Sequence, residues 1–228
     1  MPDFSDLRGR LKRQLRREWA LASGIGAILG AGAAVLVFPG AAMMQNPTGE
    51  FGWHLVGFAF LVGLGFALGQ WVVLKRLTTQ YLDPAPFVVG LWIPASTVTL
   101  MAMLLPLWWV PGGYLIMMPW LLAHKMLPGI LALAILQWLI LRRLMPAGPK
   151  WILVTVLGAV VGATLGIWWV VVLFPFLFVP GLEQEIEAIG NATFEMGWAF
   201  VTGGTIGLFQ VGELAKSISA SVETTQGD

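Results

Sequence analysis

Three glutamines are the polar residues of this sequence whose type and spacing could do chemistry. Gln70, Gln137 and Gln210 each stand near the end of a long apolar stretch, and the first two share the pattern Gln-Trp-x-x-Leu followed by two basic residues. A carboxamide both donates and accepts hydrogen bonds, and polar side chains of this kind commonly cross-link membrane helices. The alternative is that the three amides converge on a polar site for an ion or a solute.

The segments that precede the glutamines also repeat. Ser23 follows Trp19 by four residues, and Thr155 follows Trp151 at the same spacing. Each pair is followed by two glycines four residues apart, which let helices approach closely. At 1.5 Å per residue, Ser23 and Thr155 reach a depth similar to that of the glutamines, so we expect hydrogen bonds between them. A third copy fits less well, because Pro94 stands where the first glycine would be.

Composition identifies the setting in which these polar residues lie. The chain has 228 residues, of which 57% are hydrophobic and only 11% charged, whereas an average soluble domain carries about 25% charge. Its mean hydropathy is +0.80. So few charges cannot cover the surface of a soluble globule. The composition therefore excludes a soluble enzyme, a disordered chain and a nucleic-acid binder with a basic surface, and it predicts an integral membrane protein.

Long charge-free stretches locate the expected spans, since a spanning helix needs about 20 apolar residues. Backbone amides must be paired inside a bilayer, so every span should be helical. The predicted fold is an all-α, polytopic bundle of six transmembrane helices, near residues 19–42, 52–74, 87–109, 119–141, 151–177 and 191–212. They form three repeated hairpins, 19–76, 87–143 and 151–216, between a basic amphipathic segment, 1–18, and a polar tail, 213–228.

The basic residues predict the orientation of these spans. Six spans place 12 of the 13 basic residues on one side and leave Lys125 alone on the other, whereas Glu183, Glu185 and Glu187 fall opposite the basic clusters. This is the positive-inside pattern. Both termini are therefore expected on the cytoplasmic side of a bacterial cytoplasmic or thylakoid membrane.

The segment before the first span has apolar residues at helical spacing, Phe4, Leu7, Leu11 and Leu15, with cations between them. This pattern predicts a short amphipathic helix on the cytoplasmic leaflet, in contact with anionic lipid. The contact residues would be Arg8, Arg10, Lys12, Arg13, Arg16 and Arg17. Two alternatives stay open: the cations only orient the first span, or they form a docking site for a soluble partner.

The repeated Gly-x-x-x-Gln-Trp-x-x-Leu-basic-Arg ending, coupled to a Trp-x-Leu-x-Ser/Thr helix with two glycines, resembles multi-pass membrane proteins of cyanobacteria and related phototrophic bacteria. The resemblance covers nearly the whole chain and implies a bacterial, phototrophic membrane. It transfers no catalytic residue. The chain departs from the pattern in its third span and at Val211, where the other copies have Trp.

A few further polar residues are candidates for chemistry. His54 and His124 are interpreted as interfacial histidines, with ligation of a chlorophyll or haem metal as the alternative. Lys125 and Glu195 lie in the outer parts of two spans and form a candidate interhelical ion pair. The sequence names no cofactor; the aromatic content of 12% is typical of an interfacial belt and would also suit a chlorophyll or carotenoid surface.

No enzyme signature is present: no nucleophile elbow, phosphate-binding glycine loop or metal-ligand spacing, and no cysteine. The sequence therefore predicts a non-enzymatic scaffold or accessory subunit of a larger membrane complex, with a photosynthetic pigment–protein assembly as its specific form. Its partners would be the lipid bilayer and other membrane subunits, not nucleic acid. The alternative is a small transporter or substrate-binding component with the glutamines lining its polar site.

Overall fold

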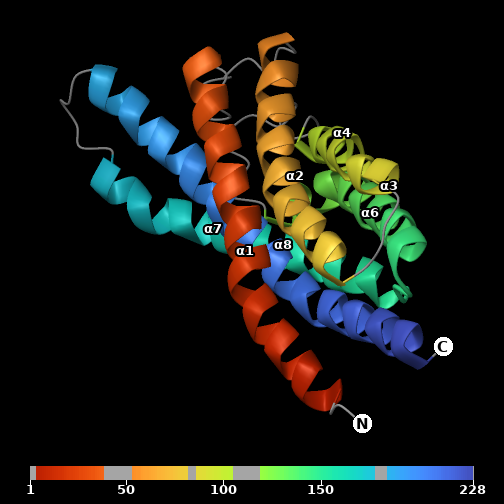
Figure 1. Ribbon diagram of the computed structural model, residues 1–228. Coiled ribbons are helices and arrows are strands. Elements are labelled where there is room, and N and C mark those ends of the chain that lie inside the picture. Colours follow the sequence, from red (N-terminus) through yellow and green to blue (C-terminus); the bar gives the residue numbers. More distant parts are fainter. Residues whose placement is uncertain (1–3, 39–52, 82–85, 105–118, 178–183, 228) are drawn as a thin grey trace.

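A computed structural model describes residues 4–38, 53–81, 86–104, 119–177 and 184–227 (Figure 1). These residues form helices and short turns and include no strand, which confirms the all-α prediction. The helices are α1 (Phe4–Val37), α2 (Trp53–Tyr81), α3 (Pro86–Gly90), α4 (Trp92–Leu104), α6 (Pro119–Leu144), α7 (Lys150–Leu177) and α8 (Gln184–Gly227).

Three helical segments are long and apolar enough to cross a membrane: Gly9–Val37, Val56–Tyr81 and Met126–Leu144. Val88–Met103 and Lys150–Gly166 are apolar over shorter lengths within the described residues. These properties support the prediction of a membrane protein. Large apolar side chains also lie exposed on several helices, among them Leu29, Val72, Val98, Leu153 and Trp168.

The long helices contact one another in a closed cycle. The contacts join α1 to α2, α2 to α4, α4 to α6, α6 to α7, α7 to α8, and α8 back to α1. We call α1–α2, α4–α6 and α7–α8 the three helix pairs. In Figure 1 the last helix lies across the first, so the two ends of the chain come together on one side of the bundle.

Small residues let the helices of each pair approach closely. A side chain at Gly26 of α1 would collide with the backbone of Gly65 in α2, and one at Gly129 of α6 would collide with Met103 of α4. In the third pair, a Cβ at Gly162 would lie 2.9 Å from the Thr202 carbonyl oxygen. Backbone contact of this kind is the main source of helix association in lipid.

Two apolar clusters form the core, and a layer of polar residues separates them. In α1, Leu15 and Trp19 belong to one cluster and Ala27 and Ala31 to the other, with Ser23 between them. Each of the other long helices also passes from one cluster to the other at a buried polar residue. These residues are Gln70, Ser96, Gln137, Thr155 and Gln210. We call these six residues the polar layer.

The structure differs from the sequence prediction at both ends of the chain. A separate amphipathic helix was expected over residues 1–18, but α1 runs without a break from Phe4 to Val37. Leu11 and Leu15 are buried, in one cluster with Leu214 and Ile218 of α8. The two described residues of the apolar stripe, Leu11 and Leu15, therefore pack inside the protein. The tail expected over 213–228 likewise continues α8 as far as Gly227.

The third span also begins later than predicted. Where one helix was expected from residue 87, the short helix α3 ends at Gly90, and α4 starts at Trp92. Starting the third copy at residue 87 places Pro94 in a glycine position, because the register is then wrong by five residues. Trp92 and Ser96 have the same four-residue spacing as Trp19 and Ser23.

Candidate functional site

The three glutamine side chains meet in the middle of the bundle and form a closed ring of hydrogen bonds. Gln70 Nε2 donates to Gln210 Oε1 at 3.1 Å, Gln137 Nε2 donates to Gln70 Oε1 at 3.1 Å, and Gln210 Nε2 donates to Gln137 Oε1 at 3.0 Å. All three side chains are fully buried. One residue from each helix pair thus contributes one donor and one acceptor to the same ring.

A hydroxyl from the partner helix of each pair takes the second amide hydrogen. Gln70 Nε2 donates to Ser23 Oγ at 3.1 Å, and Gln210 Nε2 donates to Thr155 Oγ1 at 3.0 Å. These are the two serine and threonine contacts expected from the sequence. In the third pair, Gln137 Nε2 donates to Ser96 Oγ at 3.1 Å. Ser96 is not among the residues predicted from the sequence, although the Trp-x-x-x-Ser/Thr spacing identifies it.

Two neighbouring groups fix the direction of the ring. The Ser23 hydroxyl donates to the Trp19 carbonyl oxygen at 2.7 Å, so it can only accept from Gln70. Trp19 Nε1 donates to Gln210 Oε1 at 3.0 Å, and this atom must therefore be an oxygen. With Gln70 and Gln210 oriented, Gln137 must donate to the first and accept from the second.

Three buried tryptophans lie beside the ring, each four residues before the hydroxyl residue of its helix pair. Trp19 and Trp92 have ring centroids 5.9 Å apart at an interplanar angle of 70°, and Trp92 and Trp151 have centroids 6.4 Å apart at 73°. These are edge-to-face contacts, which stabilise aromatic pairs beyond their area burial. Only Trp19 donates to a glutamine; the indole nitrogens of Trp92 and Trp151 are buried without a hydrogen-bond partner.

Every amide hydrogen of the glutamine ring already has a hydrogen-bond acceptor. Each primary amide has two hydrogens, and each of the six hydrogens meets a glutamine or hydroxyl oxygen. An ion or solute entering the ring would have to displace one of these bonds. Next to the layer, an apolar cavity of about 20 Å³ lies among residues that include Phe66, Leu100 and Trp198. That volume is about the size of one water molecule.

The third helix pair departs from the other two just beyond the layer. Trp71 and Trp138 follow their glutamines and pack under cations, with Lys75 Nζ 5.0 Å and Arg142 Cζ 5.1 Å from the respective ring centroids. Val211 occupies the equivalent position in α8 and is buried in the same cluster as Leu15 and Trp19. The N-terminal part of α1 thus covers the place where a tryptophan would stand.

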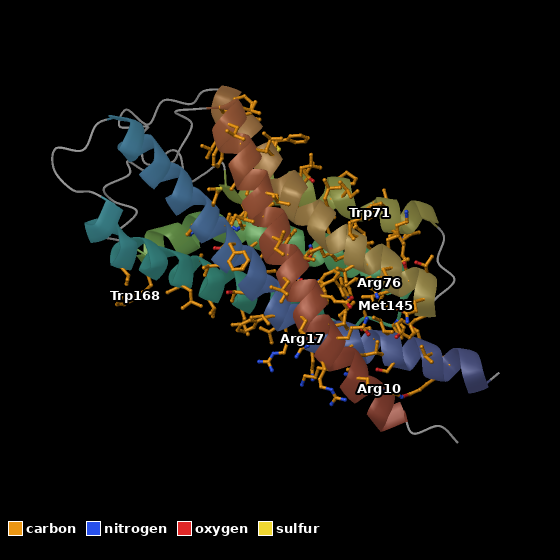
Figure 2. All side chains as sticks on the ribbon, turned by 60° about the vertical axis from the view of Figure 1, so that its left-hand side comes forward. Arg10, Arg17, Trp71, Arg76, Met145 and Trp168 are labelled. Carbon is orange, nitrogen blue, oxygen red and sulfur yellow. The ribbon has the colours of Figure 1, made fainter. Side chains whose placement is uncertain are left out.

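The basic residues of α1 lie at the end of the bundle that carries both chain termini. Figure 2 places Arg10, Arg17, Arg76 and Met145 toward this end and Trp168 away from it. Glu18 connects α1 to α2 at this end. Its carboxylate accepts a hydrogen bond from Gln14 at 3.1 Å and forms an ion pair with Arg76 of α2 at 3.5 Å.

Several predicted residues fall outside the described side chains. They are His54, His124, Lys125, Glu195 and Arg8. The proposed Lys125–Glu195 ion pair and pigment ligation by the histidines therefore stay predictions. Among the residues that the structure does describe, no group of three His, Cys, Asp or Glu side chains could hold a metal ion.

Comparison with protein-family models, curated proteins and solved structures finds no match for this chain. The resemblance to membrane proteins of phototrophic bacteria accordingly stays a prediction.

Proposed function

We propose that this chain is a six-span integral membrane protein built from three helical hairpins, and that it serves as a non-enzymatic scaffold or accessory subunit of a larger membrane complex. The observation that carries the proposal is the closed glutamine ring. Its amide hydrogens are all bonded within the protein. The polar centre of the bundle therefore holds the three helix pairs together by hydrogen bonds.

The exterior supports the same function. Apolar side chains stay exposed on α1, α2, α4, α6, α7 and α8, which is the surface that lipid tails or neighbouring membrane subunits would cover. Cations gather at one end, where both termini lie, and the positive-inside rule assigns this end to the cytoplasm. In its photosynthetic form, the proposal places pigments on the aromatic faces or at His54 and His124.

Transport is the weaker candidate. A path through the centre would need polar groups that are free to bind a solute, whereas the glutamines bind one another and the neighbouring cavity is small and apolar. Coupled transporters also usually carry ionisable residues inside their spans.

Mild detergent extraction of the native membrane, followed by native gel separation and mass spectrometry, tests the scaffold function. We expect the chain to co-migrate with other membrane subunits, and with pigment absorbance if the photosynthetic form is correct. A chain that migrates alone in every mild detergent would refute the scaffold function, and a colourless complex would refute only its pigment form.

A cysteine accessibility scan tests the closed centre, and the native chain contains no cysteine to interfere. Single Gln→Cys variants at positions 70, 137 and 210 should resist a small thiol reagent from either side of the membrane. Cysteine at exposed Gln80 near the end of α2 is the matched positive control. Labelling of all three ring positions from one side, together with solute flux in vesicles, would favour the transporter instead.

A further inference from the structure

From Arg10 to Glu18, α1 carries a basic face. Every exposed residue from Arg10 to Glu18 is lysine or arginine: Arg10, Lys12, Arg13, Arg16 and Arg17. The apolar residues of this stretch, Leu11 and Leu15, are buried against α8. A helix lying on a membrane inserts its apolar face into the bilayer, but here that face is already covered. Any ligand of this segment must be recognised by charge.

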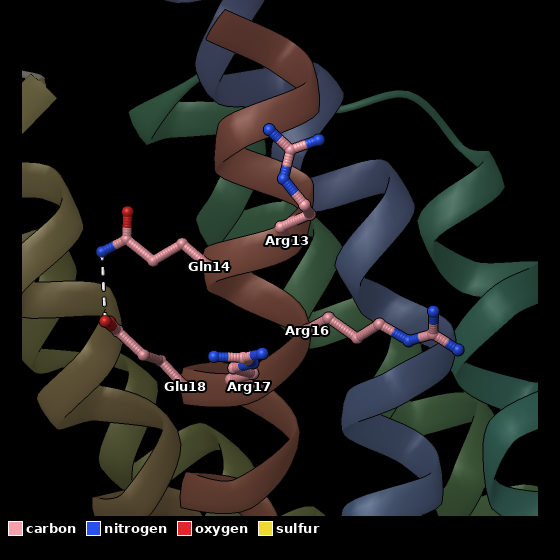
Figure 3. A pocket seen from close by; sticks show the side chains of 5 residues that line it. All are labelled: Arg13, Gln14, Arg16, Arg17 and Glu18. Carbon is pink, nitrogen blue, oxygen red and sulfur yellow. Dashed lines mark hydrogen bonds between the residues drawn. The ribbon is translucent and has the colours of Figure 1, made fainter.

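An open pocket of about 750 Å³ lies along this basic face. Figure 3 shows the side chains that line it, Arg13, Gln14, Arg16, Arg17 and Glu18, all from α1. The single carboxylate, Glu18, is engaged by Gln14 and by Arg76 of α2. Within the described part of the chain, no carboxylate pairs with Arg13, Arg16 or Arg17. Three guanidinium groups thus line the pocket without a carboxylate partner.

The polar layer fixes the depth of this pocket. Arg76 follows Gln70 by six residues and Arg143 follows Gln137 by six, while Arg17 precedes Ser23 by six. At 1.5 Å per residue, these cations lie about 9 Å from the layer on the same side. Arg13 lies about 6 Å further out. A bilayer headgroup region is roughly 5–8 Å thick on each side, so a boundary at the Arg17 level puts the pocket among the headgroups.

We propose that this pocket binds the phosphate of an anionic phospholipid headgroup, held by Arg13, Arg16 and Arg17. Guanidinium groups bind phosphate oxygens in a bidentate manner and stay charged at all physiological pH values. The lipid lies beside an upright α1, with its tails against the apolar part of the same helix. The inference rests on the membrane orientation of the proposed function but not on the scaffold role.

The test uses the full chain in nanodiscs of phosphatidylcholine with increasing fractions of phosphatidylglycerol, and it records the unfolding temperature by circular dichroism. The wild-type unfolding temperature should rise with phosphatidylglycerol and reach a plateau. In the triple variant R13Q/R16Q/R17Q, the loss is about fivefold in affinity for each arginine, or roughly a hundredfold in total. The unfolding temperature of this variant should therefore stay flat over the whole range of phosphatidylglycerol fractions. Glutamine is a good helix former, and an unchanged helical signal in phosphatidylcholine will show that the variant folds.

The matched control is R142Q/R143Q/K150Q, which removes three exposed cations at the same end from α6 and α7. It should keep the wild-type response to phosphatidylglycerol. An equal loss in both triple variants would overturn the site in favour of a non-specific basic belt. An unchanged response in R13Q/R16Q/R17Q would also overturn it and would favour an acidic protein as the ligand of this face.

Inorganic phosphate added to phosphatidylcholine discs tests whether the pocket binds free phosphate instead of the phosphate of a lipid headgroup. It should not raise the unfolding temperature; a rise that matches the phosphatidylglycerol plateau would assign the pocket to free phosphate. Failure to reconstitute the chain in any disc would refute the membrane placement itself. A reconstituted chain that is indifferent to lipid would refute only the lipid site.

Discussion

The glutamine ring and the three tryptophans occupy adjacent levels of the same bundle, and each helix pair contributes one residue to each level. In the ring, each glutamine donates to one of the other two and accepts from the other. Among the tryptophans, Trp19 donates to Gln210, whereas Trp92 and Trp151 bury their indole nitrogens without a partner. The repeat therefore preserves hydrogen bonding in one level and preserves aromatic packing in the other.

The difference between the glutamine level and the tryptophan level indicates which interactions fix the register of the helix pairs. A closed ring satisfies its own members and specifies how three helix pairs fit together. The edge-to-face contacts between tryptophans need shape and area but not a particular donor. Substitutions at equivalent positions should accordingly have equal effects only where the bonds are equal.

The largest expected effect comes from Gln210→Met, because Gln210 makes four hydrogen bonds. Removing the amide leaves buried partners on Gln70, Gln137, Thr155 and Trp19 without their bonds. Each unpaired group costs about 1 kcal/mol, since membrane bonds fall at the lower end of the range for buried groups. We expect a loss of about 4 kcal/mol in unfolding free energy, measured in mixed detergent micelles by circular dichroism.

The triple variant Q70M/Q137M/Q210M is the control for this effect. It removes donors and acceptors of the ring together, so fewer buried groups stay unpaired than three separate substitutions would leave. Its destabilisation should be well below the sum of the three single variants. Additive losses would show that the ring does not act as a unit.

Trp19→Phe and Trp151→Phe form the next comparison, because both shorten a buried indole by the same amount. Only the first also removes a hydrogen bond, the one to Gln210 Oε1. We expect Trp19→Phe to cost about 1 kcal/mol more in unfolding free energy than Trp151→Phe. Equal losses would mean that the indole bond of Trp19 contributes nothing and that all three tryptophans act by packing alone.

The smallest effect is expected at the hydroxyls. Ser96→Ala leaves one hydrogen of Gln137 without its acceptor, which should cost about 0.6 kcal/mol, the average for such bonds in membrane proteins. Ser23→Ala should cost more, because the Ser23 hydroxyl also donates to the Trp19 carbonyl and orients Gln70. The same unfolding assay measures both, and a reversed order would contradict the assignment of Ser23 as the orienting group.

The sequence predicts the residues of the polar layer well but not the way they bond. Gln70, Gln137 and Gln210 are identifiable because an amide inside an apolar segment needs a partner. Each also lies six residues before a basic residue, which indicates a similar depth. Ser96 is missed when the third copy is started at residue 87, whereas the repeated feature is the spacing from tryptophan to hydroxyl, which starts at Trp92. The direction of the ring depends on bonds to Ser23 and Trp19, and helical periodicity carries no information about these.

The same limit explains the error over residues 1–18. The spacing of Leu11 and Leu15 correctly predicts a helix with an apolar face, but it does not say what covers that face. A bilayer and a neighbouring helix are both apolar, so the sequence pattern is the same for either. Only the placement of Leu214 and Ile218 of α8 beside this stripe distinguishes the two.

The contact of α8 with α1 has a consequence for the way the protein is made. A growing chain that has completed α1 to α6 contains Gln70 and Gln137 but not Gln210, so its ring lacks a member and the side of α1 that α8 covers is bare. Helix α8, which is synthesised after the other five long helices, completes the ring and the cycle together. A chain that stops before α8 therefore leaves the amides of Gln70 and Gln137 without their bonds to Gln210. We expect membrane quality-control proteases to recognise such a chain by these unpaired amides.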